Sequence, residues 1–325
     1  MFQVASRPAA PFADMQTYNH HAQSPAPPSL NLPRSLKRPA YKEVSRSVLL
    51  AVDTSLPNYP VEFIKHHLKS RAAEMRRALG LMSIMSSLPK SHLPPYLDVP
   101  IMPSSNPPDS HDFPTHLLAI SSSKISPSAP NTPTVASFAA QAAAASSATV
   151  PLYPTNALVL AAHCTALPPL PIRRSEDETA ASVRLPLVPL TVPHGETFPP
   201  LHAFLHDKRA DKLLAFLLPS LAARFPRPPA LSTSSRDSRE TPAYVSGFSS
   251  EHMHRFAQEL ISAAYAAAGP QGAASGLMSH TRVINGLWAN TCSLGIHDTE
   301  LWSVLDFAYE IVITALTSLA TRDRY

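Results

Sequence analysis

The chain has 325 residues, a net charge of +4 and 44% apolar residues, which allows a sizeable core in one or two domains. Only 15% of the residues are charged, whereas 36 are proline and 8 are glycine. This excess of proline over glycine favours stiff, extended connectors and leaves little material for a glycine-rich phosphate-binding loop.

The two cysteines and the N-terminus bear on the compartment. Cys164 and Cys292 stand far apart within apolar helical patterns, which indicates buried, reduced thiols in an intracellular protein. The first residues lack the apolar stretch of a secretion signal. We therefore expect a soluble, intracellular protein.

Residues 1–40 are proline-rich and polar, which predicts a disordered tail. The basic cluster at its end, Arg34, Lys37 and Arg38, is either a nuclear import signal or part of a solvated linker.

A basic amphipathic helix is predicted over residues 61–79, preceded by Pro60, which suits a first helical turn. Its apolar face consists of Val61, Ile64, Leu68, Met75 and Leu79. Its basic residues gather elsewhere on the helix surface, and these are Lys65, Lys69, Arg76 and Arg77. Such a surface is either an ordinary solvated face or a site for nucleic acid or an acidic partner.

The middle of the chain alternates loops with a strand–helix pattern. A short strand is predicted to end at Ile120, followed by a low-complexity, disordered insertion over residues 121–148. Residues 149–222 then read as strand, helix, strand, helix, helix, with the first helix starting at Pro154–Thr155. Pro186 and Pro189 in the second strand predict a sheet edge or a bulge. We expect residues 149–222 to form one packed unit.

After a predicted linker at 223–248, the segment 249–320 reads as helical. One helix is expected to stop at Gly269–Pro270, a second spans about residues 280–294, and a third starts at Asp298 as its N-cap.

The last helix carries a broad apolar stripe that must be buried, and we expect it to pack against the chain's own helices. The stripe consists of Leu301, Val304, Leu305, Ala308, Ile311, Val312, Ala315 and Leu319. Three carboxylates interrupt this helix, at Glu300, Asp306 and Glu310. Because unpaired carboxylates are costly in a bilayer, we expect a core helix and not a membrane span.

The motifs that chemistry would need are missing. His202 and His206 stand four residues apart but have no cysteine pair or carboxylate cluster at a zinc spacing. His163 and Cys164 point about 100° apart on a helix, so we expect a core thiol beside a surface histidine. The glycines of 269–276 lack a following Lys-Ser/Thr and suggest a loop between helices. We therefore expect no catalytic site, no metal and no cofactor.

Four Ser/Thr-Pro dipeptides fall in the predicted linkers and are candidates for proline-directed phosphorylation, because the added charge would fall on accessible backbone. They are Ser24, Ser126, Thr132 and Thr241.

Four runs of sequence resemble the clampless protein family of basidiomycete fungi. They are RPAYKEVSRSVLLA (38–51), PVEFIKHHLKS (60–70), LYPTNALVLAAHCTALPPLP (152–171) and VPLTVPHGETFPPLHAFLHDKRADKLLAFLLP (188–219). The resemblance covers about residues 38–320. It implies a developmental regulator that acts downstream of mating-type homeodomain proteins in clamp-cell formation and dikaryotic growth, with no catalytic residues to carry over.

The runs at 152–164 and 184–211 are also similar, more distantly, to the strand–helix steps of BTB/POZ domains. This likeness implies an α+β fold with a small BTB/POZ-like sheet and dominant helices over 41–222, followed by the helical part at 249–320.

These expectations combine into a non-enzymatic regulatory protein that binds other regulatory proteins, transcription factors among them, and does not bind a membrane. We expect it in the nucleus, or otherwise in the cytoplasm. The alternative is a nucleic-acid-binding regulator that uses the basic helix at 61–79.

Overall fold

The structure is a computed structural model that describes residues 32–56, 59–106, 108–123, 149–171, 182–228 and 243–322. The helices and strands described all belong to one compact unit that starts at Ser35. The phosphorylation candidates Ser24, Ser126, Thr132 and Thr241 lie outside the described residues, as do most of the predicted tail and insertion.

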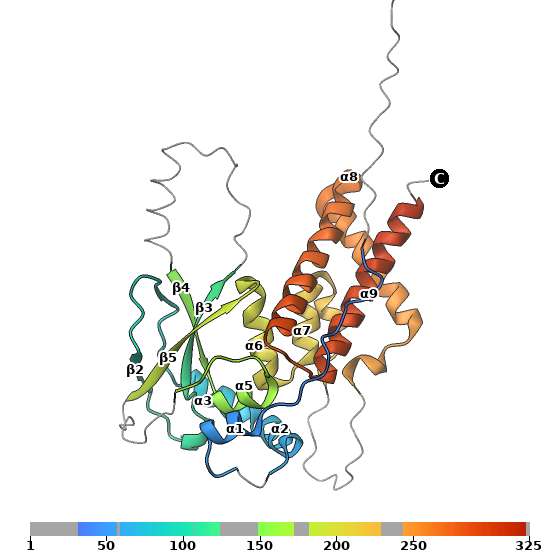
Figure 1. Cartoon of the computed structure of the whole chain (residues 1–325). Coiled ribbons are helices and arrows are strands. Elements are labelled where there is room, and N and C mark those ends of the chain that lie inside the picture. The colour runs from blue at the N-terminus through green and yellow to red at the C-terminus, as the bar shows by residue number, and fades with distance from the viewer. Residues whose placement is uncertain are drawn as a thin grey trace, which may run out of the picture. The chain divides into compact units, whose positions relative to one another are not determined.

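Five strands form one mixed, curled sheet in the order β1-β4-β3-β5-β2 (Figure 1). The central strand β3 pairs antiparallel with β4 and parallel with β5, while β1 and β2 add antiparallel edges. A bridge between Met82 and Ile101 links the segment before β1 to the end of β2, which draws the two edges together. The strands are β1 (Ser87–Pro89), β2 (Tyr96–Pro100), β3 (His116–Ser122), β4 (Thr149–Thr155) and β5 (Ser182–Val192).

The two prolines of β5 do not place it at the sheet edge, because β5 lies between β3 and β2. The prediction is wrong because the two halves of β5 pair with different strands: the pairing with β2 ends at Pro186, and the pairing with β3 starts at Leu187. Leu187 donates to the carbonyl of Pro95 on the β2 side. Backbone N–H groups point alternately to the two neighbouring strands, so the nitrogen of Pro189 faces the β2 side as that of Leu187 does. Pro189 lies beyond the last residue of β2 that pairs with β5. Its missing N–H therefore breaks no ladder bond.

The helices gather on one side of the sheet (Figure 1). They are α1 (Arg46–Val52), α2 (Val61–Ser70), α3 (Ala72–Gly80), α5 (Ala157–His163), α6 (Phe198–Asp207), α7 (Ala210–Leu217), α8 (Ser250–Ser293) and α9 (Thr299–Arg322). Short 3₁₀ turns lie between them, at Ser110–Asp112, Gly195–Thr197, Pro219–Arg224 and Tyr244–Gly247.

One helix is broken where the prediction has it continuous, and another starts later than predicted. The helix predicted over 61–79 is broken at Arg71, whose guanidinium binds Asp109 and Asp112, and the break leaves Leu79 37% exposed. The helix predicted from Pro154 starts at Ala157, because Pro154 still pairs with β3.

The predicted stop at Gly269–Pro270 is present as a break inside α8, where Gly269 has φ +68°. The predicted loop after it is wrong, since helix resumes directly and includes Gly272 and Gly276. Pro270 explains the immediate restart, because a proline N–H is not needed in a first helical turn.

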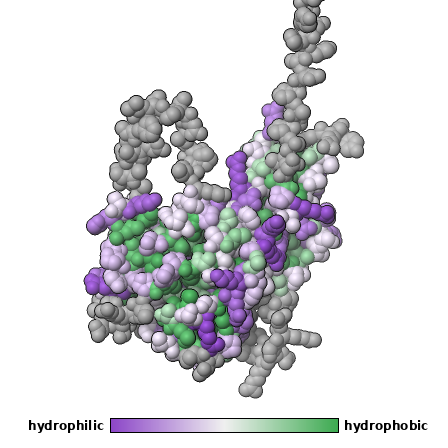
Figure 2. All heavy atoms as spheres, viewed as in Figure 1, coloured by the Kyte–Doolittle hydropathy of each residue, from purple (hydrophilic) through white to green (hydrophobic). Residues whose placement is uncertain are grey.

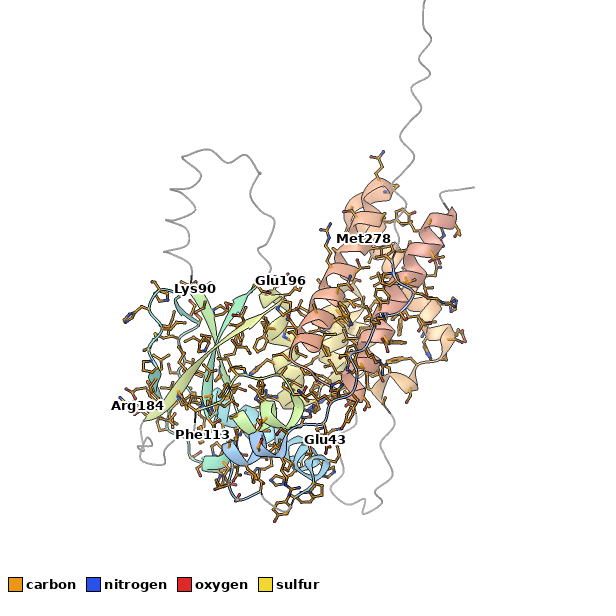
Figure 3. The ribbon with its side chains drawn as sticks, viewed as in Figure 1. Glu43, Lys90, Phe113, Arg184, Glu196 and Met278 are labelled. Carbon is orange, nitrogen blue, oxygen red and sulfur yellow. The ribbon has the colours of Figure 1, made fainter. Side chains whose placement is uncertain are left out.

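The sheet separates two hydrophobic cores, because successive side chains of a strand point to opposite faces. Leu117 and Ala119 of β3 join a smaller core with β2, β4 and the first half of β5. Leu118 and Ile120 face the helices in the larger core. Side chains fill the space between sheet and helices (Figure 3).

The prediction that residues 149–222 pack together is confirmed, since Leu190 and Phe204 share the larger core and Leu158 packs against it. That core also continues into α2, α8 and α9. The domain boundaries predicted at 222 and 249 stay predictions.

The eight stripe residues of α9 are all buried, which confirms the predicted packing within the chain. Asp298 caps this helix as predicted, its carboxylate accepting from the Leu301 N–H at 2.9 Å. By length and composition alone α9 is apolar enough to cross a membrane, but ten of its residues are buried in the described structure, as in a core helix.

Replacing Leu305, which is fully buried, with aspartate tests this packing. Leu305→Asp places an unpaired carboxylate in the larger core and should lower the free energy of unfolding by about 3 kcal/mol or more, measured by urea denaturation. Thr317→Asp, on the exposed side of the same helix, is the control and should change stability by about 0.5 kcal/mol at most. An unchanged midpoint for Leu305→Asp would contradict the packing.

Candidate functional site

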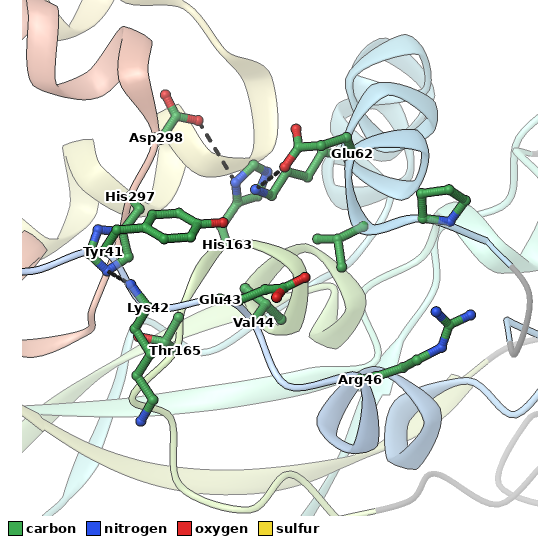
Figure 4. Close-up of a pocket in the computed structure, with 13 residues that line it drawn as sticks. Tyr41, Lys42, Glu43, Val44, Arg46, Glu62, His163, Thr165, His297 and Asp298 are labelled. Carbon is green, nitrogen blue, oxygen red and sulfur yellow. Dashed lines mark hydrogen bonds and ion pairs between the residues drawn. The ribbon is translucent and has the colours of Figure 1, made fainter.

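A cavity of about 410 Å³ opens where four segments meet (Figure 4). One wall is the strap, defined as residues 35–45, together with Arg46, and another is the start of α2 from Pro60 to Lys65. The end of α5 and the residues before α9 supply the rest, namely His163, Thr165, His297 and Asp298. The lining includes three Lys/Arg and three Asp/Glu side chains, a balance that does not favour a polyanion.

A buried ion pair lies at one end of this cavity. Lys208, directly after α6, places its Nζ 2.7 Å from Oδ2 of Asp298. His163 at the end of α5 lies beside both, with Nδ1 3.4 Å from the lysine Nζ and 3.8 Å from the same carboxylate oxygen. The Lys208 ammonium donates, so His163 accepts at Nδ1 and carries its proton on Nε2.

Burial and charge set the protonation states of this cluster. Burial, aided by the charge of Lys208, lowers the pKa of His163 to about 3. Burial alone would raise the pKa of Asp298, but the charge and hydrogen bond of Lys208 outweigh it and lower that pKa to about 2. The cluster at neutral pH is therefore an ammonium–carboxylate pair beside a neutral imidazole.

The predicted surface position of His163 is wrong, since its side chain is buried under the cavity. Its neighbour Cys164 is buried as predicted, and burial raises the pKa of that thiol to about 12. A cysteine nucleophile needs a thiolate, so this thiol is in the unreactive form. Both side chains are thus buried in their neutral forms.

Three exposed aromatic side chains lie on the segments that line the cavity, and one of them, Tyr41, is itself a lining residue. Tyr41 is 75% exposed and its ring meets His297 edge-on at 5.2 Å. Tyr59 and Phe63, which flank the lining residues Pro60–Glu62, are 48% and 54% exposed and stack on each other at 5.2 Å. We call Tyr41, Tyr59 and Phe63 the aromatic rim.

Three of the four candidate basic residues have acidic partners within the chain. Lys65 pairs with Glu62, Lys69 lies 4.0 Å from Glu300, and Arg76 pairs with Asp207 at 3.1 Å. Arg77 is exposed on α3, beyond the break at Arg71. The break and these pairs divide what the sequence presented as one basic surface.

One residue of the candidate import cluster contacts α9. Lys37 and Arg34 have exposed side chains. Arg38 is exposed as well, at 51% of its side chain, and it forms an ion pair with Asp306 and lies over the ring of Trp302, 5.6 Å from its centroid.

His202 and His206 do share one face of α6, with ring centroids 4.3 Å apart. His206 cannot serve as a metal ligand in this arrangement, because Nδ1 donates to the His202 carbonyl and Nε2 accepts from the Asn156 N–H. Within the described parts of the chain, no group of three or more His, Cys, Asp or Glu side chains is placed to hold a metal ion.

Sequence reasoning missed Lys208, which lies in the charged stretch 207–211 between the two last predicted helices of the 149–222 unit. Nothing in its local sequence signals that its ammonium is buried, because its partners are 45 and 90 residues away. The rim aromatics had a weak signal, as Tyr59 and Phe63 flank a helix start but lie off its apolar face.

Comparison with known families gives two adjacent matches. Residues 39–193 match the Clampless protein 1 N-terminal domain, and residues 211–325 match the Clampless protein 1 C-terminal domain. No curated protein and no solved structure matches the chain, so the BTB/POZ likeness stays a prediction. His163 lies in the first matched segment, Asp298 in the second, and Lys208 between them.

Buried histidines should make the stability of this protein depend on pH. Burial lowers the pKa of His163 to about 3, that of His206 to about 4, and that of His202 well below its usual value. Below about pH 6.5 only the unfolded chain takes up these protons. The free energy of unfolding therefore decreases as the pH is lowered, by up to about 1.4 kcal/mol per pH unit for each histidine.

His202→Phe isolates one of these contributions, since the His202 ring packs among Tyr153 and Phe198 and its Nε2 has no partner. Urea denaturation at several pH values between about 7.5 and 5 gives the slope of the free energy of unfolding against pH. In His202→Phe this slope should be smaller by the contribution of about one histidine. The exposed His92→Phe is the control and should keep the original slope. An unchanged slope in His202→Phe would refute a buried, neutral His202.

Proposed function

Since the chain belongs to the clampless protein family, which indicates a role in clamp-cell development, we propose that it acts there as a non-enzymatic regulatory protein through contacts with other proteins. Its partners are regulatory proteins, transcription factors among them, and it works downstream of mating-type homeodomain proteins in the nucleus. It does not act on a membrane. The family resemblance supports this placement in the pathway.

The aromatic rim is the observation that carries the proposal of protein contacts. Tyrosine and phenylalanine are enriched at protein interfaces, where rigid rings bury large areas at a small entropic cost. Tyr41, Tyr59 and Phe63 present such rings beside a polar cavity of balanced charge. A partner can pack on the rings while its polar groups reach the cavity lining.

The chemistry of the cavity also supports a binding role. The buried charges of Lys208 and Asp298 neutralise each other in an ion pair. The imidazole of His163 is neutral because burial lowers its pKa. The adjacent thiol of Cys164 is protonated. A general base or a nucleophile would need a pKa moved toward neutrality, and both of these pKa values move away from it.

Nucleic-acid binding remains a second candidate because of one observation. Residues 37–80 hold nine lysines and arginines against four aspartates and glutamates, so this segment carries a net charge of +5 in a chain whose total is +4. Yet Lys65, Lys69 and Arg76 already face carboxylates of the chain, which weakens their attraction for phosphate. Protein binding is therefore the better supported function.

The rim can be tested with Tyr59→Ser and Phe63→Ser combined. Both rings are half exposed, so the variant should stay folded while losing partner contact area. In cells whose own copy is deleted, the variant should restore clamp-cell formation much less than the unaltered protein. The control combines Tyr96→Ser with Phe216→Ser, which are 46% and 40% exposed outside the rim, and should restore it fully.

Equal restoration by the rim variant and the control would refute the rim as the working surface.

Binding of the purified chain to DNA tests the second candidate. We expect little binding at physiological salt. Tight, salt-sensitive binding that disappears when Lys65, Lys69, Arg76 and Arg77 are changed to alanine would reverse the ranking.

A further inference from the structure

The strap carries a short segment that is bound to α8 and α9 as a peptide ligand would be. Leu36 is buried in the larger core, with 8% of its surface exposed. The carbonyl of Lys37 accepts a hydrogen bond from the Trp288 indole at 2.8 Å. Arg38 pairs with Asp306 and covers the ring of Trp302. In Figure 1 the strap runs alongside α9, and Figure 2 shows hydrophilic residues along the same line.

These three contacts define a binding site with a specific chemistry. A core position accepts an apolar side chain, an indole N–H binds the next carbonyl, and a carboxylate beside a tryptophan ring holds a guanidinium. Arginine suits the last position, because it both pairs with carboxylates and stacks on aromatic faces. We call the site formed by Trp288, Trp302 and Asp306 the strap groove.

Beyond these contacts, the nearest backbone anchor of the strap is the Lys42 N–H, which donates to Nε2 of His297 at 3.2 Å. Residues 36–44 form no helix or strand, and their backbone makes no hydrogen bond to the backbone of another described residue. Among the described residues, no helix or strand precedes the segment. Leu36–Arg38 can therefore leave the groove without unfolding any helix or strand.

The groove and its occupant also differ in their relation to the family. Trp288, Trp302 and Asp306 lie within the segment that matches the C-terminal family domain. Leu36–Arg38 precede the first matched segment, which starts at residue 39. The receptor is thus part of the recognised domain, whereas the ligand that fills it here is not.

We propose that the strap groove is a docking site for an extended segment of a partner protein, with an apolar residue two positions before an arginine. In this chain Leu36–Arg38 occupy the site and compete with the partner. The groove residues Trp288, Trp302 and Asp306 differ from those of the aromatic rim, although Tyr41 of the rim follows Arg38 on the strap, and the proposal stands whether or not the rim binds anything. Because the competing segment is tethered, its effective concentration is high, and a partner binds only in proportion to the fraction of open grooves.

A fluorescent peptide with the sequence of residues 33–40 tests the groove by anisotropy with the full-length chain. The full-length variant Leu36→Asp with Arg38→Asp should release the strap, because one new carboxylate would enter the core and the other would face Asp306. The peptide should bind this released variant at least about tenfold more tightly than the unaltered chain. Circular dichroism confirms that the variant is folded, and Arg38→Asp alone replaces it if it is not.

Two substitutions in the released variant test the chemistry of recognition. Asp306→Asn removes the partner of the arginine and should weaken peptide binding at least about tenfold. Glu310→Gln, an exposed carboxylate one turn further along α9, should leave it unchanged. Equal binding to the released and unaltered chains, no binding to a folded released variant, or equal effects of the two substitutions would each overturn the proposal.

Discussion

The ion pair between Lys208 and Asp298 fixes the geometry on which the cavity depends. The carboxylate of Asp298 caps α9 through the Leu301 N–H and holds the Lys208 ammonium, so one side chain sets both the start of α9 and the end of α6. Lys208 is the one residue other than glycine with a positive φ in the described parts of the chain, at 51°. A left-handed backbone costs a lysine roughly 1 kcal/mol or more, and the buried pair offsets this cost.

Other contacts tie the same regions together and make the two matched family domains parts of one unit. The backbone of Thr165 and Ala166, after α5, bonds to residues 294–295 between α8 and α9. Gly295 is required there, because it has φ +62° and a Cβ would lie 2.1 Å from the Thr165 hydroxyl. The buried side chain of Asn290 on α8 bonds to both backbone groups of His194, after β5. The cavity therefore exists only while both domains are folded against each other, and we infer that the protein works as a single unit.

Local patterns in the sequence predicted local structure well. The strand–helix order of residues 149–222, the cap at Asp298 and the apolar stripe of α9 are all present, because each depends on neighbours within a few residues. The predictions that failed depend on distant partners. The break at Arg71 follows from Asp109 and Asp112, and the interior place of β5 follows from its pairing with β2 and β3. The burial of His163 and Lys208 likewise depends on Asp298, so no spacing along the chain could reveal it.

A double-mutant cycle on Lys208 and Asp298 tests the central claim most directly. Asp298→Asn keeps a capping side chain for α9 but removes its charge, and Lys208→Met keeps the apolar stem. Each single change should lower the free energy of unfolding by about 3 kcal/mol, because it leaves the partner charge buried and unpaired. The double change should cost less than the sum by about 2 kcal/mol, measured by urea denaturation. Additive losses would show that the two residues do not depend on each other and would contradict this account.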